Sequence, residues 1–409
     1  MDEKQHLAML ATPAMYHINK GDPFRVENVI DAIDQPGEWC INTIDHTVTI
    51  LPPEGVDIST AEVIAPVLTN LIEVKGTDEK ERLVCGLVFK GITFAQAVNA
   101  IVMKNVRSCR VENCRIVGLG GDGITLGEYA QRNVIEANTI TMCGGRGINL
   151  NGYFPGTKDV NHHNVIVNND ISQCGRYKWS STGINLFQSG FNVIKRNYIH
   201  DMPYIGISGF GNVTTYFNMH RDERSGEFRW DEIDKNDPLT RDSIKQYLHT
   251  RYNLIEENVV ARYMGILDDG GGIYFWGAGV GNVIRRNICS DTVRSEGLSV
   301  GLYMDEESDG QLIEKNTVYR TARLTIDHGI NAWVNNHIYK YNSEPNDVNK
   351  ETSRVITKTR IRLFKGNIDV LYDSFGFPKS VRNIIHKPKP LRYLDIKPGR
   401  GAIIMDPVF

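Results

Sequence analysis

Two stretches of the chain carry acidic residues beside glycines and aromatic residues. The first is DDGGGIYFWG, which contains Asp268 and Asp269, and the second is GLYMDEESDG, which contains Asp305 and Glu306. Two carboxyl groups held about 5 to 10 Å apart can act on a glycosidic bond, one as general acid and the other as nucleophile or base. The candidate catalytic residues are therefore Asp305, Asp268 and Asp269, and Glu306 is a candidate for contacting a substrate.

Each acidic stretch has a simpler interpretation as a surface turn. In a fully extended strand Asp269 would also lie seven positions from the level of Asp305, which is over roughly 20 Å. A loop that folds back over the strand is therefore required. The run Gly270 to Gly272 permits positive φ and a sharp reversal, so the sequence allows such a loop.

A repeat organises the middle of the chain and decides which side chains can meet. Its first half reads N-[VL]-I-x-x-N, and its second half is a short strand that begins with glycine. The first half occurs as NVIEAN, NVIVNN, NVIKRN, NLIEEN, NVIRRN and QLIEKN, starting at Asn133, Asn164, Asn192, Asn253, Asn282 and Gln311. The second half starts at Gly123, Gly147, Gly183, Gly206, Gly272, Gly301 and Gly329.

Short β-branched segments without helical periodicity, in coils of about 23 to 31 residues, predict an all-β parallel β-helix. Each strand then pairs with its counterpart one coil away, about 4.8 Å distant. The second asparagine of each repeat should form one column of bonded side-chain amides, made of Asn113, Asn138, Asn169, Asn197, Asn258, Asn287 and Asn316. Cys143 and Cys174 should stack as buried thiols, with a redox pair as the alternative.

The outward positions of the glycine-led strands combine aromatic rings with amide and hydroxyl groups. Alternation predicts an outward column of Thr125, Asn149, Asn185, Ser208, Tyr274, Tyr303 and Asn331, and a second of Asn151, Phe187, Phe210, Trp276, Asp305 and Trp333. This mixture suits sugars, whose C–H groups stack on rings while their hydroxyls need hydrogen-bond partners. Aromatic ladders that only stabilise a sheet are the alternative for Tyr274 and Tyr303.

In this register Asp305 lies between Trp276 and Trp333. A carboxyl group between two indoles is poorly solvated, which favours the protonated form that a general acid needs. The next coil should bring His328 and Asp327 beside the same group, either to orient a substrate or to form a turn. The predicted substrate-binding residues are Tyr274, Trp276, Tyr303, Trp333, Asn331, His328, Glu306 and Asn185.

The repeat divides the chain into three regions. Residues 1–84 form a β-rich N-terminal cap, residues 85–340 the parallel β-helix, and residues 341–409 a C-terminal cap or extension. A charged insertion at about residues 213–250 should leave the stack as a loop, and such loops often wall a binding site.

Composition excludes several classes of function. With 46 Lys and Arg against 49 Asp and Glu, the chain lacks the basic surface of a nucleic-acid-binding protein, and no apolar run is long enough to cross a membrane. The seven cysteines include no CxxC pair, so neither a disulfide framework nor a zinc site is expected. The sequence also contains no phosphate loop, and no cofactor or metal is expected. The start MDEKQHLAML predicts a cytoplasmic protein, or a secreted or periplasmic one if an export signal has been lost.

Several stretches together resemble glycoside hydrolase family 141. They are PGEW at Pro36, LPPEG at Leu51, GLVFKGITF from Gly86, DDGGGIYFWG and GLYMDE. The resemblance implies a right-handed β-helix enzyme with α-L-fucosidase-like or xylanase-like activity on plant cell-wall glycans. It also implies two catalytic aspartates, which by motif fall on Asp268 or Asp269 and on Asp305.

The leading hypothesis is thus a glycoside hydrolase that cleaves a plant-type poly- or oligosaccharide with a pair of aspartates in a groove on the β-helix face. A polysaccharide lyase is the second hypothesis. It needs a basic residue near a uronate and usually calcium, and Arg146 in GRGINL is its candidate base. A non-catalytic carbohydrate-binding β-helix is the third.

Overall fold

A computed structural model describes residues 18, 22–77, 82–219, 229–234, 236, 239–334, 336–339, 355–356 and 360–361. The chain divides into two compact units. The first, whose described residues lie within 18–62, contains the short 3-10 helix η1 (Ile30–Ala32) and an antiparallel hairpin of β1 (Trp39–Asn42) and β2 (Thr47–Ile50). The second unit, which holds the remaining residues, contains the candidate site.

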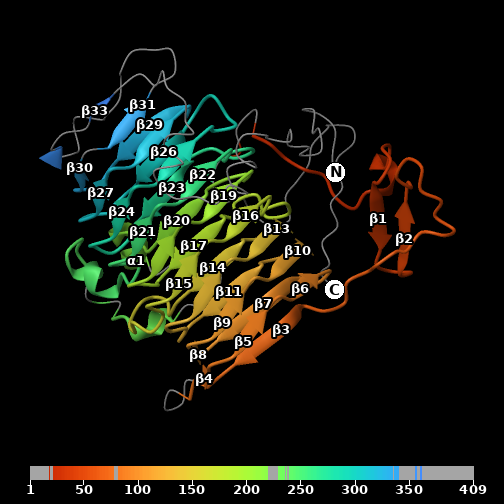
Figure 1. Ribbon diagram of the computed structural model, residues 1–409, viewed down its shortest axis with the longest axis horizontal. Helices are drawn as coiled ribbons and strands as arrows, with labels where there is room; N and C mark the ends of the chain where they lie inside the picture. The colour runs from red at the N-terminus through yellow and green to blue at the C-terminus, as the bar shows by residue number, and fades with distance from the viewer. Residues whose placement is uncertain are drawn as a thin grey trace. The chain divides into compact units, whose positions relative to one another are not determined.

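Three long parallel sheets build the second unit, and they are named here sheets A, B and C (Figure 1). Within the described residues, sheet A consists of β3 (Asn70–Lys75), β7 (Asn99–Lys104), β11 (Ile124–Gly127), β14 (Ile148–Asn151), β17 (Ile184–Phe187), β20 (Ile207–Phe210), β23 (Gly270–Trp276), β26 (Ser299–Met304) and β29 (Arg323–Asp327). Sheet B consists of β5 (Val88–Lys90), β9 (Arg110–Glu112), β12 (Val134–Glu136), β15 (Val165–Val167), β18 (Val193–Lys195), β21 (Leu254–Glu256), β24 (Val283–Arg285), β27 (Leu312–Glu314), β30 (Ala332–Val334) and β32 (Val355–Ile356). Sheet C consists of β6 (Thr93–Ala95), β10 (Arg115–Leu119), β13 (Thr139–Cys143), β16 (Asp170–Ser172), β19 (Tyr198–His200), β22 (Val259–Ala261), β25 (Ile288–Ser290), β28 (Thr317–Tyr319), β31 (His337–Tyr339) and β33 (Arg360–Ile361).

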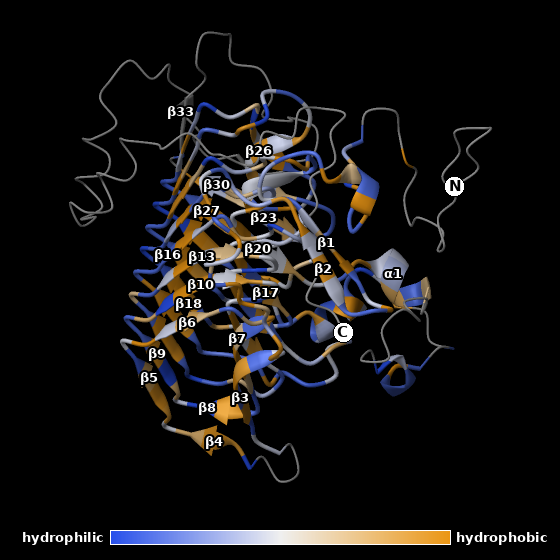
Figure 2. Cartoon of the chain, turned by 90° about the vertical axis from the view of Figure 1, so that its right-hand side faces the viewer, coloured by the Kyte–Doolittle hydropathy of each residue, from blue (hydrophilic) through white to orange (hydrophobic). Residues whose placement is uncertain are grey.

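Each coil from β3 to β31 contributes one strand to each sheet, so the predicted parallel β-helix is confirmed. Its interior is a continuous hydrophobic core made of the inward residues of all three sheets, such as Ile148, Ile166 and Ile171. Hydrophobic colour follows the strands in Figure 2, and the turns between them are more hydrophilic. The stack begins with β3, ahead of residue 85, where the repeat alone placed its start. The short strands β4 (Val84–Cys85) and β8 (Val106–Arg107) form an additional parallel pair in its first coils.

Two columns of asparagines fix the coils in register. The Oδ1 atom of Asn169 accepts hydrogen bonds from the backbone N (3.0 Å) and from Nδ2 (2.9 Å) of Asn138 in the preceding coil, and Asn169 does the same to Asn197. The residue before each of these asparagines has a left-handed backbone, with φ of 56° at Ala137. Such a corner turns backbone donors away from the strand ladder, and the asparagine oxygen of the next coil accepts from one of them.

The asparagine column begins one residue later than predicted in its first coil. Asn113 is exposed with φ of 50°, and Cys114 occupies the ladder position, where its backbone N donates to Oδ1 of Asn138 at 2.9 Å. The placement of Asn113 in the column is therefore wrong, because CRVENC from Cys109 is a copy of the repeat in which cysteines replace both asparagines. All seven cysteines are free, and both burial and a hydrogen bond with Cys174 raise the pKa of the Cys143 thiol.

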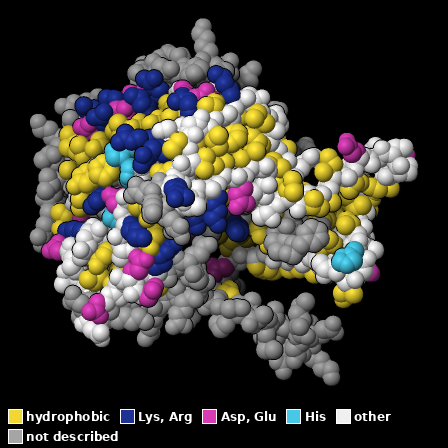
Figure 3. Space-filling model, turned by 90° about the horizontal axis from the view of Figure 1, so that it is seen from below, with side chains coloured by type: hydrophobic (Ala, Val, Ile, Leu, Met, Phe, Trp, Pro, Cys, Tyr) yellow, Lys and Arg dark blue, Asp and Glu magenta, His cyan; other side chains and the backbone are white. Residues whose placement is uncertain are grey.

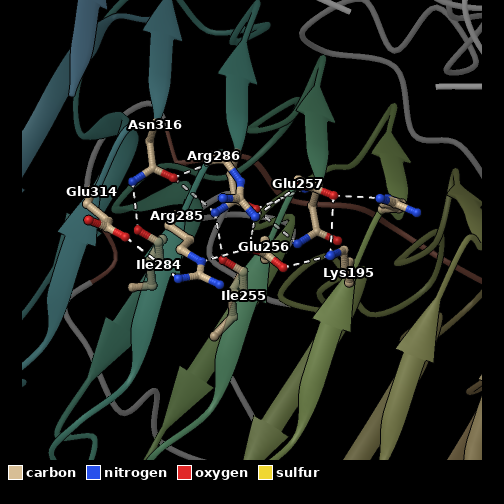
Figure 4. Close-up of polar contacts among 12 residues, drawn as sticks. Lys195, Ile255, Glu256, Glu257, Ile284, Arg285, Arg286, Glu314 and Asn316 are labelled. Carbon is tan, nitrogen blue, oxygen red and sulfur yellow. Dashed lines mark hydrogen bonds and ion pairs between the residues drawn. The ribbon is translucent and has the colours of Figure 1, made fainter. Parts of the chain in front are cut away.

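The outward face of sheet B carries a column of alternating charges (Figure 4). Glu256 accepts from Lys195 Nζ at 2.8 Å and from Arg285 Nε at 2.7 Å, and Arg285 also pairs with Glu314 at 3.8 Å. The face of the molecule in Figure 3 likewise shows acidic side chains beside several of the Lys and Arg side chains. Glu256 is buried, at 2% exposed, so its pairs with Lys195 and Arg285 mainly offset the cost of removing its charge from water.

The insertion between β20 and β21 stands outside the stack. Its described part contains α1 (Thr214–Met219) and the 3-10 helices η3 (Trp230–Glu232) and η4 (Ser243–Tyr247). Its own hydrophobic cluster consists of Phe217, Trp230, Ile233, Ile244 and Leu248 with Phe154 from the loop after β14. Because β20 still pairs directly with β23, the insertion does not disturb the register of sheet A.

We predict that Asn138→Ala lowers the free energy of unfolding. The change leaves the backbone N–H of Cys114 and the carbonyl of Val111 without their side-chain partners, at about 1 to 3 kcal/mol for each buried group. Urea unfolding measures the loss. The exposed neighbour Thr139→Ala is the control, with an effect within about 1 kcal/mol. Equal losses in the two variants would contradict a stabilising role for the amide column.

Candidate active site

Asp305 lies directly after β26, where three neighbouring coils converge. Its side chain is buried: Oδ2 accepts a hydrogen bond from the Tyr274 hydroxyl of β23 at 2.7 Å, and Oδ1 lies 2.9 Å from Nδ1 of His328, which follows β29. The backbone N of Asp305 donates to the carbonyl of Phe275 at 2.7 Å, which continues the pairing of β23 with β26. The carboxylate is therefore held from both sides along the stack.

Asp269 reaches the same group of side chains from the loop before β23. It has φ of 61°, and its carbonyl accepts a hydrogen bond from the Tyr204 hydroxyl at 2.7 Å. Its Oδ1 lies 3.4 Å from the hydroxyl of Tyr303. The Tyr303 ring in turn lies edge-on to Tyr274, with ring centroids 5.0 Å apart, and next to His328 at 5.7 Å. The reversal that two cooperating carboxyl groups require is thus present.

The reversal occurs at Asp269, and the expectation that Gly270 to Gly272 supply it is wrong. These glycines are the first three residues of β23, and none of them has positive φ. They are needed for close packing instead. A Cβ atom on Gly270 would lie 2.8 Å from Ile205, and one on Gly272 would lie 2.9 Å from the sulfur of Cys289.

The two aspartates influence each other electrostatically. Asp269 is exposed as a residue, but partial burial of its carboxyl group raises its pKa, and the nearby charge of Asp305 raises it further. The hydroxyl of Tyr303 opposes this rise because its hydrogen bond favours the ionised carboxylate. Burial also raises the pKa of Tyr303, and the charges of Asp305 and Asp269 raise it further.

Asp268 points away from this group of residues. Its Oδ2 accepts a weak hydrogen bond of 3.4 Å from the backbone N of Leu298. The same oxygen lies so close to Gly297 that a Cβ atom on this residue would be only 1.9 Å from it, and Gly297 has φ of 75°. The structure therefore separates the adjacent acids, with Asp269 beside Tyr303 and Asp268 against the turn before β26.

The register predicted above Asp305 is wrong for Trp333 and Asn331. The partner of β26 is β29, in which Met304 pairs with Asp327, so the next residue above Asp305 is His328. Trp333 lies in sheet B opposite Ile313. The reason is that NAWVNN from Asn331 is a further copy of the asparagine half of the repeat, in a coil only 20 residues long, and Gly329 consequently falls in a turn.

Asp327 holds that turn. Its carboxylate accepts hydrogen bonds from the indole Nε1 of Trp333 at 2.7 Å, from Nδ2 of Asn331 at 2.7 Å and from the backbone N of Gly329 at 3.0 Å. The turn interpretation of Asp327 therefore describes its observed contacts, and Trp333 and Asn331 take part in the same network.

Three more predicted residues lie at different distances from the carboxyl pair. Trp276 is the neighbour of Asp305 across β23 and β26, as the register required. Glu306 is exposed, and only its carbonyl is engaged, by the backbone N of Gly277 at 2.8 Å. Asn185 lies two coils away in β17, where it donates to Asn149 at 2.9 Å and accepts from Ser208 at 2.9 Å.

Sequence reasoning missed Tyr204 and the attachment of the insertion. Tyr204 precedes β20 and has no counterpart in the repeat that would mark it. The acids Glu307 and Asp309, in the turn after Asp305, bind Thr214 and Arg241 of the insertion. The charged residues of this turn and of the insertion were the only sequence signal that the two segments could bind each other.

The described residues contain no cluster of three or more His, Cys, Asp or Glu side chains placed to hold a metal ion. No helix in the described ranges is long and apolar enough to span a membrane.

Comparisons with known proteins agree with this architecture. Residues 72–220 match the family described as "Right handed beta helix region". A solved structure titled "Glycoside hydrolase" superposes with a TM-score of 0.59 and 20% identity over 76% of this chain and 57% of that one. The catalytic domain of a GH87 alpha-1,3-glucanase in complex with tetrasaccharides gives a TM-score of 0.44 and 14% identity over 66% of this chain and 48% of that one. A search of curated proteins finds no matching sequence. The fold is a right-handed parallel β-helix, and the chain spans little more than half of the hydrolase that it resembles.

Proposed function

We propose that this protein is a glycoside hydrolase that acts on a plant-type poly- or oligosaccharide. One observation carries the proposal: Asp269 and Asp305 come from loops 36 positions apart in sequence, yet they meet through two touching tyrosines. Oδ1 of Asp269 lies 3.4 Å from the Tyr303 hydroxyl, and the Tyr303 ring contacts Tyr274, which donates to Asp305. Two carboxyl groups in one neighbourhood, with a raised pKa on one of them, form the arrangement that cleaves glycosidic bonds.

The two aspartates take different roles in this proposal. Asp269, whose pKa is raised by burial and by Asp305, is the general acid that donates a proton to the leaving glycosidic oxygen. Asp305 is the nucleophile or the base that activates water, held in place by Tyr274 and His328. This reverses the role expected for Asp305 from its sequence neighbours, because Trp333 does not flank it.

Tyr274 and His328 position the Asp305 carboxylate. Each donates to, or pairs with, a different oxygen of the carboxylate, which fixes its plane relative to the strand. His328 remains exposed beyond that contact, so its second ring nitrogen is open to a sugar hydroxyl. Such fixed partners keep a reacting group within the narrow range of angles that catalysis requires.

Three further observations support a hydrolase. The fold is like that of a solved glycoside hydrolase. The motifs DDGGGIY and GLYMDE, which carry the resemblance to family 141, supply both members of the pair. Arg146, the candidate base of a lyase, stands before β14, three coils from β23, and its backbone N donates to Asp122. It is therefore remote from the carboxyl pair.

We predict that Asp305→Asn and Asp269→Asn each lower turnover at least about 100-fold, because each removes one of the two carboxyl functions. Release of reducing sugar and of nitrophenol from a panel of cell-wall polysaccharides and para-nitrophenyl glycosides measures the activity. Asp268→Asn is the matched control. A loss in Asp268→Asn equal to that in Asp269→Asn, or an unsaturated product, would contradict the assignment.

Tyr303→Phe should shift the alkaline limb of the pH profile of kcat/KM upward. The Tyr303 hydroxyl lowers the pKa of Asp269 by bonding its ionised form, so removing it raises that pKa. A general acid works while it is protonated, and activity then persists to higher pH. Tyr274→Phe, which removes a hydroxyl from Asp305 instead, is the comparison. A downward shift in Tyr303→Phe would contradict the acid role of Asp269.

The raised pKa of Asp269 also affects stability. Its folded-state pKa lies above the unfolded value, so the folded protein loses stability as pH rises through that range. Asp269→Asn should therefore gain melting temperature relative to wild type as the pH increases. Asp201→Asn should do the opposite, because hydrogen bonds from His200 and Arg262 outweigh burial and lower the pKa of Asp201. Thermal melts across the acidic to neutral range provide the measurement.

A further inference from the structure

The insertion is tied to the turn that carries Asp305. Glu307 Oε2 accepts hydrogen bonds from the backbone N (2.9 Å) and the hydroxyl (2.7 Å) of Thr214, the first residue of α1. Arg241 forms a two-pronged pair with Asp309, at 2.8 Å and 2.6 Å. Ser308 closes this turn by donating to the carbonyl of Asp305 at 3.0 Å. The position of α1 is therefore fixed relative to Asp305.

This attachment brings Tyr216 to Trp276. The ring of Tyr216, two residues into α1, meets the ring of Trp276 edge-on, with centroids 5.7 Å apart and planes at 61°. Trp276 is the neighbour of Asp305 one coil below, since Phe275 pairs with Met304. Trp276 thus lies one coil below the candidate carboxylate, and Tyr216 from the insertion packs against Trp276.

Packing of the insertion does not account for Tyr216. The adjacent Phe217 is fully buried in the cluster that also contains Trp230, Ile244 and Leu248, and this cluster anchors the insertion. Tyr216, by contrast, is 43% exposed, and Trp276 is also partly open to solvent. Aromatic rings that keep accessible surface beside polar groups are typical of sugar-binding sites.

We infer that Tyr216 and Trp276 form a subsite for a second sugar ring, next to the sugar whose bond is cleaved at Asp305. The ligand is then a chain of at least two sugars, an oligo- or polysaccharide, and the insertion selects for it. This inference rests on the proposed hydrolase function for the position of the cleaved bond, but the stacking contact itself requires no turnover.

Binding to inactive protein tests the subsite. In the Asp305→Asn background, adding Tyr216→Ala should weaken binding of xylohexaose or of soluble xylan or xyloglucan by about threefold to tenfold, the effect of losing one aromatic contact. Calorimetry and affinity gel electrophoresis measure it. Tyr216→Phe should keep the affinity, because the ring remains.

Tyr252→Ala is the matched control, since Tyr252 is 49% exposed and, like Tyr216, has an aromatic neighbour, here Phe191 stacked at 5.1 Å. Its affinity should equal that of the parent. Unchanged affinity in Tyr216→Ala, an equal loss in Tyr252→Ala, or no binding of any of these glycans by the parent would overturn the subsite. Melting curves of each variant show that the fold is intact.

Turnover separates this inference from the proposed function. With Asp305 intact, Tyr216→Ala should lower kcat/KM for an oligosaccharide more than for a para-nitrophenyl glycoside, which offers only one sugar. A wild-type protein that binds glycans through Tyr216 without cleaving them would refute the hydrolase and keep the subsite. Cleavage with equal losses on both substrates would do the reverse.

Discussion

Registry between successive coils is the constraint on which the rest of the structure depends. Parallel strands alone define it loosely, because one residue of slip would still satisfy a strand ladder while turning every side chain to the other face. The asparagine columns remove that freedom, since the side-chain amides of Asn138, Asn169 and Asn197 each bond to the same position one coil away, which a slip would break. Tyr274, Asp305 and His328 meet because they occupy fixed positions in three coils that are locked in this manner.

Much of the fold could be predicted because the sequence repeat marks where each coil begins and which strands pair. Where the period is kept, the register is correct, as for Trp276 beside Asp305. The predicted register failed at Gly329, because that glycine continued the spacing of the glycine-led strands although the coil itself had shortened. The copy NAWVNN was the better marker of the register. The predicted amide column failed at Asn113 because Cys114 holds the column position in that coil. The side chain at this position need not accept a hydrogen bond from a preceding amide.

The candidate site was less predictable because its decisive features are not periodic. The left-handed conformation of Asp269 and the hydroxyl of Tyr204 on its carbonyl come from loops of irregular length. The run of glycines predicted a turn at Gly270. In the structure these glycines are extended, and their lack of a side chain lets Ile205 and Cys289 pack close to the backbone. Local sequence indicated that a carboxyl group stands here. Only the surrounding coils determine its direction, its burial and its proximity to Asp305.

The amide columns run in one sense only. Every side-chain oxygen accepts from the coil before it, from Cys109 through Asn133 and Asn164 in one column and from Cys114 through Asn138 to Asn336 in the other. The dipoles of consecutive amides consequently add rather than cancel, and each bond polarises the next. The solenoid thus has an electrical polarity along its axis. A coil inserted into this stack must keep the same direction of its side-chain amides, since in a reversed coil the amide oxygens of neighbouring coils would face each other.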